Sequence, residues 1–339
     1  MTDTGKQPVD LRGRPMRDLR ISVTDRCNFR CVYCMPREIF GPGFEFMRRS
    51  QILSYEEIER LARVFAGLGV VKLRITGGEP LVRRDVEQLV ARLVAVPGIE
   101  DVAMTTNGAL LAGKAEALRA AGLRRVTISL DSLDDAVFRA MNDVDFPVAR
   151  VLEAIDAAAL AGLAVKVNAV IKRAWNDDGV TALAGHFRGT GHVLRLIEYM
   201  DVGNSNGWRM DDVVPAAKLL EEIDARWPIE PVEPAYPGEV ASRYRYLDGA
   251  GEIGVIASVS QPFCGACTRA RLSADGKLYT CLFASAGHDL RGIVRSTADD
   301  DELAERVAGI WRARADRYSE LRSARTRPLR RVEMSHIGG

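Results

Sequence analysis

All six cysteines of this 339-residue chain fall into two groups of three, and this partition constrains the fold more than any other feature. The first group lies in "DRCNFRCVYCMP" at residues 25–36 and comprises Cys27, Cys31 and Cys34. The second lies in "PFCGACTRARLSADGKLYTC" at residues 262–281 and comprises Cys264, Cys267 and Cys281. Thiolates are preferred ligands of zinc and of iron–sulfur clusters. The chain is therefore expected to fold around two thiolate sites that lie far apart in the sequence.

The cellular compartment determines whether these thiols form disulfides or stay reduced. The first residues, "MTDTGKQPVD", contain no apolar signal-peptide core, and no run of about 18 apolar residues predicts a membrane span. We therefore expect a cytoplasmic protein, whose thiols stay reduced and serve a metal or catalysis rather than disulfides. The net charge is +1, so bulk charge gives no reason to expect nucleic acid or a membrane surface as a partner.

Zinc and iron–sulfur clusters make different demands on three cysteines. Structural zinc is almost always held by four Cys or His ligands, so each group is one ligand short. His288, seven residues after Cys281, could complete a Cys3His site, and zinc therefore stays open for the second group. The first group has no histidine nearby. An iron–sulfur cluster usually takes four cysteines, and a cluster held by three leaves one iron open to a non-protein ligand.

Between the cysteine groups, short β-branched runs alternate with amphipathic helical stretches. Strands are predicted at 19–24, 71–76, 102–106, 125–130, 165–171 and 193–199. Helices are predicted at 54–68, 83–96, 110–121, 133–141, 148–161 and 177–188. Near-continuous apolar strands that alternate with helices indicate a parallel sheet covered by helices. Six such units predict an α/β fold, a partial (β/α)6 TIM-like barrel.

The last third of the chain changes character. Residues 201–215 and 228–239 are rich in turn formers and predict loops. "GEIGVIAS" predicts a strand, Asp275-Gly276 predicts a hairpin within 269–283, and 300–315 predicts an amphipathic helix. We therefore expect a barrel core at 1–215 and a C-terminal β-rich module at 216–339 that carries the second cysteine group.

Functional residues of such barrels lie at the carboxyl ends of the strands. Polar segments occur at those places: "TGGEP" (76–80), "TTNG" (105–108), "SLDS" (129–132) and "YMDVG" (199–203). Taken alone, "TGGEP" is equally compatible with an ordinary strand-to-helix turn. Lys166 lies within the fifth predicted strand, where it would point into the barrel or form a buried ion pair with a barrel carboxylate.

The C-x3-C-x2-C spacing, with an aromatic residue before the third cysteine, resembles the radical S-adenosylmethionine superfamily. The resemblance implies a [4Fe–4S] cluster on Cys27, Cys31 and Cys34 whose open iron binds S-adenosylmethionine and releases a 5′-deoxyadenosyl radical. It also implies that Gly78 and Glu79 of "TGGEP" bind the amino group of the cofactor, because the glycines allow a close backbone approach.

Over nearly its whole length the chain resembles the GTP 3′,8-cyclases, through the second motif C-x2-C-x13-C and the "RAR" that follows Cys267 within it. The resemblance implies a second [4Fe–4S] cluster that binds the purine of GTP. The radical would take hydrogen from ribose C3′, and C3′ would attack C8 of guanine, the first step of molybdenum cofactor biosynthesis. The implied GTP-binding residues are Arg20, Arg74, Thr105, Lys166, Arg269 and Arg271. The implied S-adenosylmethionine contacts are Tyr33, Gly78, Ser129 and Met200.

The printed sequence ends in "HIGG", which has three interpretations. It is compatible with a frayed tail, and with a tail that is adenylated as in ubiquitin-like proteins. The resemblance implies a third, in which Gly338 and Gly339 enter the active site beside GTP and assist the cyclisation.

Two rival functions remain open at this point: a radical enzyme that acts on a peptide and carries an auxiliary cluster, and a zinc-stabilised binding module without chemistry. As partners the resemblance implies GTP, an electron donor of the flavodoxin or ferredoxin type, and cyclic pyranopterin monophosphate synthase as the next enzyme. A homodimer is one assembly that the sequence allows.

Overall fold

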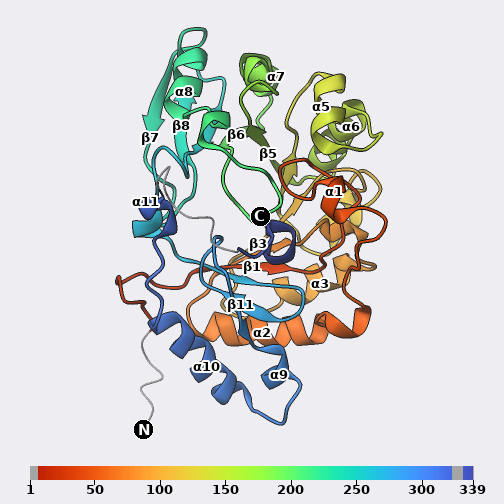
Figure 1. Cartoon of the computed structure of the whole chain (residues 1–339), viewed down its shortest axis with the longest axis vertical. Helices are drawn as coiled ribbons and strands as arrows, with labels where there is room; N and C mark the ends of the chain where they lie inside the picture. The colour runs from red at the N-terminus through yellow and green to blue at the C-terminus, as the bar shows by residue number, and fades with distance from the viewer. Residues whose placement is uncertain (1–6, 323–330, 339) are drawn as a thin grey trace.

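The computed structural model describes residues 7–322 and 331–338, which are organised around one curved sheet of twelve strands (Figure 1). The strand order is β12-β11-β10-β1-β2-β3-β4-β5-β6-β9-β8-β7. The central six strands are parallel to their neighbours. They are β1 (Asp18–Ser22), β2 (Lys72–Thr76), β3 (Asp101–Thr106), β4 (Arg125–Ser129), β5 (Ala164–Ile171) and β6 (Val193–Glu198). The predicted α/β fold with a parallel-dominated sheet is confirmed.

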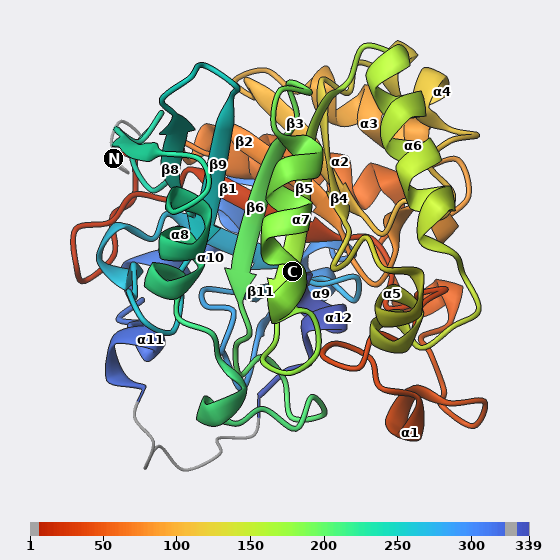
Figure 2. The ribbon, with the colours of Figure 1, turned by 90° about the horizontal axis from the view of Figure 1, so that it is seen from above.

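The connecting helices lie mainly on the outer face of this sheet (Figure 2). They are α2 (Tyr55–Gly67), α3 (Val86–Val94), α4 (Ala115–Ala120), α5 (Asp135–Asn142), α6 (Val148–Leu160) and α7 (Val180–Phe187). The Ser54 hydroxyl accepts a hydrogen bond from the Glu57 amide, and the Glu57 carboxylate accepts one from the Ser54 amide, so a capping box starts α2 as its sequence predicts.

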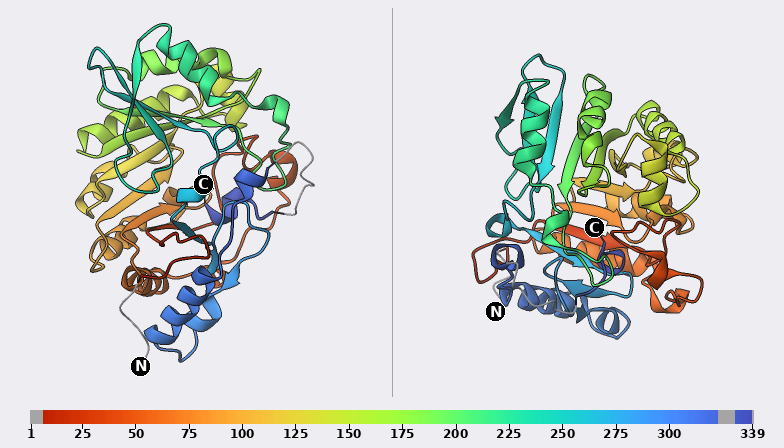
Figure 3. Two further views of the ribbon diagram at one scale, coloured as in Figure 1. Left: turned by 90° about the vertical axis from the view of Figure 1, so that its left-hand side faces the viewer. Right: turned by 45° about the horizontal axis from the view of Figure 1, so that its top comes forward.

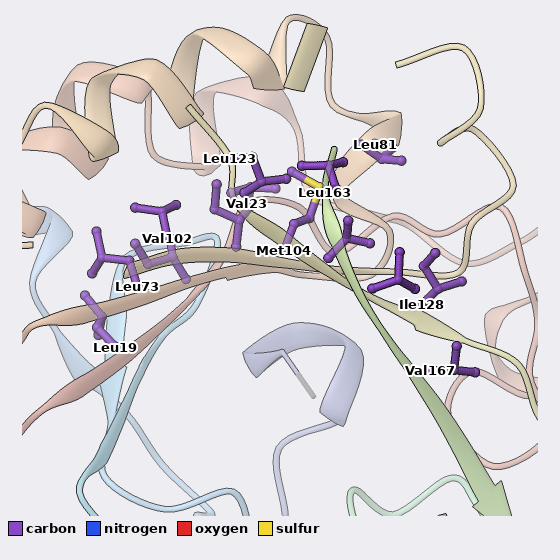
Figure 4. Packing of buried hydrophobic residues seen from close by; sticks show 14 of the residues in the cluster. Leu19, Val23, Leu73, Leu81, Val102, Met104, Leu123, Ile128, Leu163 and Val167 are labelled. Atoms are coloured by element: carbon purple, nitrogen blue, oxygen red, sulfur yellow. The ribbon is translucent and has the colours of Figure 1, made fainter. Parts of the chain in front are cut away.

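The apolar core fills the space between the sheet and these helices (Figure 4). Leu19, Leu73 and Met104 point into it from successive strands and are at most 2% exposed. Because side chains alternate across a strand, the residues next to them, such as Asp18 and Arg20, point to the opposite, inner face. The sheet therefore separates an apolar outer layer from a polar interior.

The C-terminal strands join both edges of the same sheet. Strand β9 (Glu252–Ile256) pairs in parallel with β6, and β10 (Arg269–Leu272) pairs in parallel with β1. The remaining strands are antiparallel to their neighbours: β7 (Ile229–Val232), β8 (Ser242–Tyr246), β11 (Lys277–Tyr279) and β12 (His288–Asp289). The β10–β11 hairpin is confirmed. The division of the chain at residues 215 and 216 stays a prediction.

The loop predicted at 228–239 is wrong for residues 229–232, which form β7. Pro231 lies within this strand, and proline cannot donate to a strand ladder. The strand escapes that penalty because β7 is the last strand at its edge of the sheet.

Further helices complete the described chain: α1 (Arg37–Phe40), α8 (Ala216–Asp224), α9 (Arg291–Val294), α10 (Asp300–Arg312), α11 (Tyr318–Leu321) and α12 (Met334–Ile337). Helix α10 confirms the helix predicted at 300–315 and lies beside α2, where Arg60 Nε is 2.7 Å from Asp300 Oδ1. Helix α12 lies inside the curve of the sheet (Figure 3). Within 7–322 and 331–338, no helix is both long and apolar enough to cross a membrane.

Candidate active site

The inner face of the sheet encloses a cavity of about 270 Å³. Its lining contains ten Arg and Lys residues but only five Asp and Glu residues. Most of the residues that the sequence analysis implicated in binding lie on this one surface: Arg20, Tyr33, Arg74, Thr105, Ser129, Lys166, Met200, Cys264, Cys267, Arg269, Arg271 and Cys281. The cavity therefore combines an excess of positive charge with three thiols.

Three arginines stand side by side across adjacent strands. The strand registers place Arg20 of β1 opposite Arg271 of β10 on one side and opposite Arg74 of β2 on the other. Burial, and then the neighbouring guanidinium groups, lower the pKa of Arg20. Arg74 Nη1 donates to the hydroxyls of Thr105 (3.0 Å) and Thr127 (3.2 Å) instead of to a carboxylate. Such a row of like charges is suited to a ligand that carries several negative charges.

Lys166 and Arg195 continue the positive lining on β5 and β6. Burial, followed by the charges of Arg195 and Arg125, lowers the pKa of Lys166 to about 8. Arg195 Nη2 donates to Thr127 Oγ1 at 3.1 Å. Lys166 does point into the barrel as expected, whereas Arg195 was missed. A weak signal was present, because Arg195 is a charged residue within the otherwise apolar stretch "VLRLI" of β6.

Lys72 was missed as well. It lines the cavity beside Asp18, its register partner on β1, and its Nζ lies 2.9 Å from the centroid of the Tyr236 ring. Lys72 is the first residue of β2. Its place in the cavity lining depends on how β2 pairs with β1, which the sequence alone does not show.

The second cysteine group lies at the start of β10 and the end of β11. The Cys267 amide donates to the Cys264 carbonyl at 3.2 Å, which closes a short turn between these two cysteines. In the β10–β11 hairpin, Arg271 is opposite Tyr279, so the same register brings Cys281 back beside Arg269. His288, the alternative zinc ligand, lies exposed on β12. Across the described ranges, no three His, Cys, Asp or Glu side chains converge closely enough to hold a single metal ion.

Buried positive groups surround these thiols. Arg314 Nη2 donates to Cys267 Sγ at 3.1 Å. Burial alone would raise the pKa of the Cys267 thiol, but Arg269 and Arg314 lower it to about 7. Arg14 Nη2 is buried without a hydrogen-bond partner within the described structure, and Arg14 lines the cavity with the cysteines. Three thiols, one of them thiolate-prone, and an unpartnered donor fit an iron–sulfur cluster, whose sulfur atoms accept hydrogen bonds.

The first cysteine group is braced by the segment "TGGEP". The Gly78 amide donates to the Thr24 carbonyl and the Glu79 amide to the Arg26 carbonyl, both at 2.8 Å. A Cβ atom on Gly78 would lie 2.2 Å from the Arg26 carbonyl oxygen. The close approach that the glycines allow is therefore made to the chain that leads into Cys27.

Glu79 is buried and joins the ends of β2 and β3. Its carboxylate accepts hydrogen bonds from the Leu81 amide, the Thr106 hydroxyl and the Asn107 amide at 2.7–3.0 Å. Burial raises the pKa of Glu79 to about 7. Gly78 and Glu79 do not belong to the lining of the main cavity, and their role in binding a cofactor stays a prediction.

Tyr33 connects the first cysteine group to the cavity. It lies between Cys31 and Cys34, it lines the cavity, and its hydroxyl donates to Asp131 Oδ2 at 2.6 Å. Asp131 Oδ1 in turn accepts from the Val170 amide at 2.9 Å, and burial raises the pKa of Asp131 to about 6. The aromatic residue of the motif is thus fixed against the end of the fourth strand.

The C-terminal segment enters the same interior. The Gly338 carbonyl accepts a hydrogen bond from Arg271 Nη1, and Ile337 is fully buried. Gly338 has a φ of +73°, and a Cβ atom there would lie 2.3 Å from Thr76 Cγ2. The frayed-tail interpretation is therefore wrong for residues 331–338. Gly339 lies outside the described residues.

Polar contacts hold this segment from two sides. The Glu333 carboxylate accepts from the Asn204 amide at 3.0 Å and from the Ser205 hydroxyl at 2.7 Å. His336 Nε2 lies 3.1 Å from Asp275 Oδ1 on the β10–β11 hairpin. The tail is thus attached to the loop after β6 and to the module that carries the second cysteine group.

Two family models match the chain. The model of the Radical SAM superfamily covers residues 21–185, and that of Molybdenum Cofactor Synthesis C covers residues 192–320. The first match ends within α7, and the second begins just before β6.

Curated relatives match over almost the full length. The GTP 3′,8-cyclase of Acidothermus cellulolyticus is 56% identical and is aligned over 98% of this chain and 99% of its own. The proteins of the same name from Xanthomonas axonopodis pv. citri and Staphylococcus aureus are 53% and 49% identical, over 97% and 98% of this chain and 98% and 99% of theirs.

A solved structure supports the fold. Streptococcus suis SuiB, bound to its precursor peptide SuiA, aligns with a TM-score of 0.61 at 15% identity, over 87% of this chain. The alignment spans 64% of the SuiB chain. At this identity the likeness extends to the fold alone.

Proposed function

The chain belongs to the GTP 3′,8-cyclase family of radical S-adenosylmethionine enzymes in molybdenum cofactor biosynthesis, and we propose that it cyclises GTP to (8S)-3′,8-cyclo-7,8-dihydroguanosine 5′-triphosphate. The cofactors are two [4Fe–4S] clusters and S-adenosylmethionine. When bound, the cluster on Cys27, Cys31 and Cys34 would supply the one electron that splits S-adenosylmethionine into methionine and a 5′-deoxyadenosyl radical. That radical would remove hydrogen from ribose C3′, and C3′ would bond to C8 of guanine.

One observation carries the proposal for the substrate. The row of Arg271, Arg20 and Arg74 opens onto the cavity that also contains the second cysteine group. Adjacent buried guanidinium groups repel one another, and a triphosphate relieves that repulsion with charge-assisted, bidentate hydrogen bonds. The arginine row suits a polyanionic group, and a cluster on the three cysteines suits a group that can bind iron. GTP has both groups, the triphosphate and the purine.

The residues divide accordingly. Cys264, Cys267 and Cys281 hold the second cluster, to which the purine binds. The phosphate-binding set on the inner face of the sheet is Arg20, Arg74, Thr105, Lys166, Arg269 and Arg271. Their placement on one cavity wall supports this assignment.

Cys27, Cys31 and Cys34 hold the first cluster, and the residues that orient S-adenosylmethionine are Tyr33, Gly78, Glu79, Ser129 and Met200. Tyr33, Ser129 and Met200 come from three separate elements and line the cavity together, which supports their share of the assignment. Glu79 organises the ends of β2 and β3 through its three hydrogen bonds, and in this way it keeps the cofactor-binding backbone of Gly78 in place.

Gly338 and Gly339 act beside the substrate. The hydrogen bond between Arg271 and the Gly338 carbonyl supports this role, because Arg271 is also a member of the phosphate-binding set.

The electron for the first cluster comes from a flavodoxin- or ferredoxin-type donor, and cyclic pyranopterin monophosphate synthase consumes the product. A homodimer is the proposed assembly. Sedimentation of the reconstituted protein with each candidate partner tests these associations.

The decisive experiment incubates the reduced, anaerobically reconstituted protein with S-adenosylmethionine and GTP. We expect 5′-deoxyadenosine and a cyclised GTP in equal amounts. A protein that forms 5′-deoxyadenosine with a peptide substrate, and no product from GTP, would contradict the proposal.

Two serine variants separate the functions of the clusters. Cys27→Ser should stop cleavage of S-adenosylmethionine altogether. Cys264→Ser should leave some uncoupled cleavage but no cyclised product. Equal residual cyclisation in both variants would argue against separate tasks for the two cysteine groups.

A further inference from the structure

A buried network of charges contacts the backbone of the second cysteine group. It consists of Asp10 and Arg14 from the N-terminal segment and Arg314 from the segment just after α10, and each residue is at most 5% exposed. Asp10 Oδ2 joins the two arginines, at 2.6 Å from Arg14 Nε and 3.1 Å from Arg314 Nη1. The function proposed above uses none of these three residues.

The two arginines hold the backbone of the cysteine turn. Arg14 Nη1 donates to the Cys264 carbonyl at 2.7 Å, and Arg314 Nη1 donates to the Cys267 carbonyl at 2.8 Å. Arg314 also reaches the thiol itself, with Nη2 at 3.1 Å from Cys267 Sγ. The remaining nitrogen of Arg14, Nη2, is buried and has no partner among the described residues. Both guanidinium groups therefore present a donor to the position of the cluster.

The formal charges of this network match those of a cluster. Two guanidinium groups and one carboxylate leave one net positive charge. A [4Fe–4S]2+ cluster on three thiolates carries one negative charge. Arg269, Arg271 and Asp316 also interact electrostatically with these thiols, and together they add one further positive charge. A buried charge is costly unless it is compensated, so the network provides the counter-charge that the cluster needs.

We propose that the network of Asp10, Arg14 and Arg314 sets the reduction potential of the cluster at Cys264, Cys267 and Cys281: the two arginines raise the potential, and Asp10 partly offsets them. Adding an electron makes the cluster more negative, and nearby positive charge and hydrogen bonds to sulfur favour that state. The three side chains are positioning residues, since they act through the cluster and its ligands. This inference rests on the proposed function, because it requires a cluster at the second site.

The test uses the full chain, reconstituted anaerobically, with Cys27, Cys31 and Cys34 replaced by serine so that only the second cluster contributes a signal. The potential is measured by a redox titration that follows the paramagnetic resonance of the reduced cluster. Arg314→Gln should lower the potential and Asp10→Asn should raise it. We expect each to change the ratio of oxidised to reduced cluster at a fixed applied potential at least tenfold, about 59 mV for a one-electron couple.

The opposite signs separate tuning from mere support, because damage to the fold has no reason to move the two variants in opposite directions. Arg312→Gln is the matched control, since Arg312 lies on the same helix and its side chain is half exposed. It should leave the potential unchanged. Equal shifts in all three variants, or shifts of the same sign for Arg314→Gln and Asp10→Asn, would overturn the inference.

The iron content of each variant is measured as well, so that loss of the cluster is distinguished from a change in its potential. If Arg314→Gln loses its iron, Asp10→Asn decides alone, and an unchanged or lowered potential in that variant refutes the proposed tuning. If the serine background itself binds no iron, the second cluster is absent and the proposed function fails with it. If the background binds iron but the potentials do not move, only the present inference fails.

Discussion

Replacing Gly338 by alanine should block cyclisation while leaving the fold intact. Gly338 combines a φ of +73° with a ψ of 128°, a conformation that L side chains rarely adopt. Holding alanine there costs about 1–3 kcal/mol. The equilibrium constant for docking the tail should therefore fall roughly 5- to 150-fold.

Steric overlap adds to this backbone cost. The new methyl group would lie 2.3 Å from Thr76 Cγ2, and Thr76 is a buried residue at the end of β2 that has little room to move. Thr76→Ser removes the methyl group that is contacted and keeps the hydroxyl. The double variant should therefore recover part of the loss, but not the part that comes from the backbone.

The assay compares the initial rates of 5′-deoxyadenosine and of cyclised GTP in the same reaction, with the thermal midpoint as a measure of folding. We expect at least a tenfold loss of cyclised product with the midpoint nearly unchanged. Gly309→Ala is the control, because Gly309 lies in α10 and a Cβ atom there meets nothing within 4 Å. Full activity of Gly338→Ala, or no recovery on adding Thr76→Ser, would refute this account of the tail.

Three other perturbations test the cavity. Because the pKa of Lys166 is about 8, GTP should bind most tightly below that pH, where the amine is charged, and more weakly as pH rises through it; Lys166→Arg should flatten this calorimetric profile. Arg195→Ala should raise KM for GTP about tenfold or more, consistent with 1.5–3 kcal/mol for a charge-assisted hydrogen bond, whereas an unchanged KM would exclude Arg195 from binding. Inorganic triphosphate at about 100 times its Kd should stabilise the protein by about 2.7 kcal/mol in thermal unfolding, and Arg20→Ala should remove most of that gain.

The central sheet was predictable because each of its strands keeps apolar residues on the outer face, and amphipathic helices separate the strands along the chain. The edge strands were not. Strand β7 has four residues, one of them Pro231, and it depends on β8 for its hydrogen bonds. Helix α12 has only four residues, too few for a periodic pattern, and its position depends on contacts with residues far away in the sequence.

The site divides in the same way. Residues in short motifs, such as Cys27 and Gly78, could be proposed from the sequence because local spacing carries the signal. Arg195 and Arg314 belong to no motif, and a charged residue inside an apolar strand was the only sequence signal for Arg195. The first becomes a cavity residue through the inward register of β6, and the second through the contact between α10 and the cysteine turn. Tertiary pairing, which one sequence does not display, decides both.

The strand order also determines how the two cysteine groups face each other. Strand β10 runs parallel to β1, with Arg269 beside Asp18 and Leu272 beside Ile21. Cys267 precedes β10 and Cys27 follows β1, so the two groups lie at opposite ends of the same pair of strands. Five residues at about 3.3 Å each separate those ends by roughly 16 Å. The second group therefore departs from the rule that barrel sites lie at the carboxyl ends of strands.

Because of this separation, the residues between the two cysteine groups matter as well as the groups themselves. A distance of roughly 16 Å is too long for direct contact between groups held at the two ends. The row of Arg271, Arg20 and Arg74 crosses the strands midway, and Gly338 connects that row to Thr76 at the end of β2. In the proposed function, a substrate bound to a cluster on Cys264, Cys267 and Cys281 would extend along these residues to bring its reacting carbon towards the other end. Gly338 lies so close to Thr76 that a Cβ atom would collide with its methyl group, and for that reason a residue without a side chain stands there.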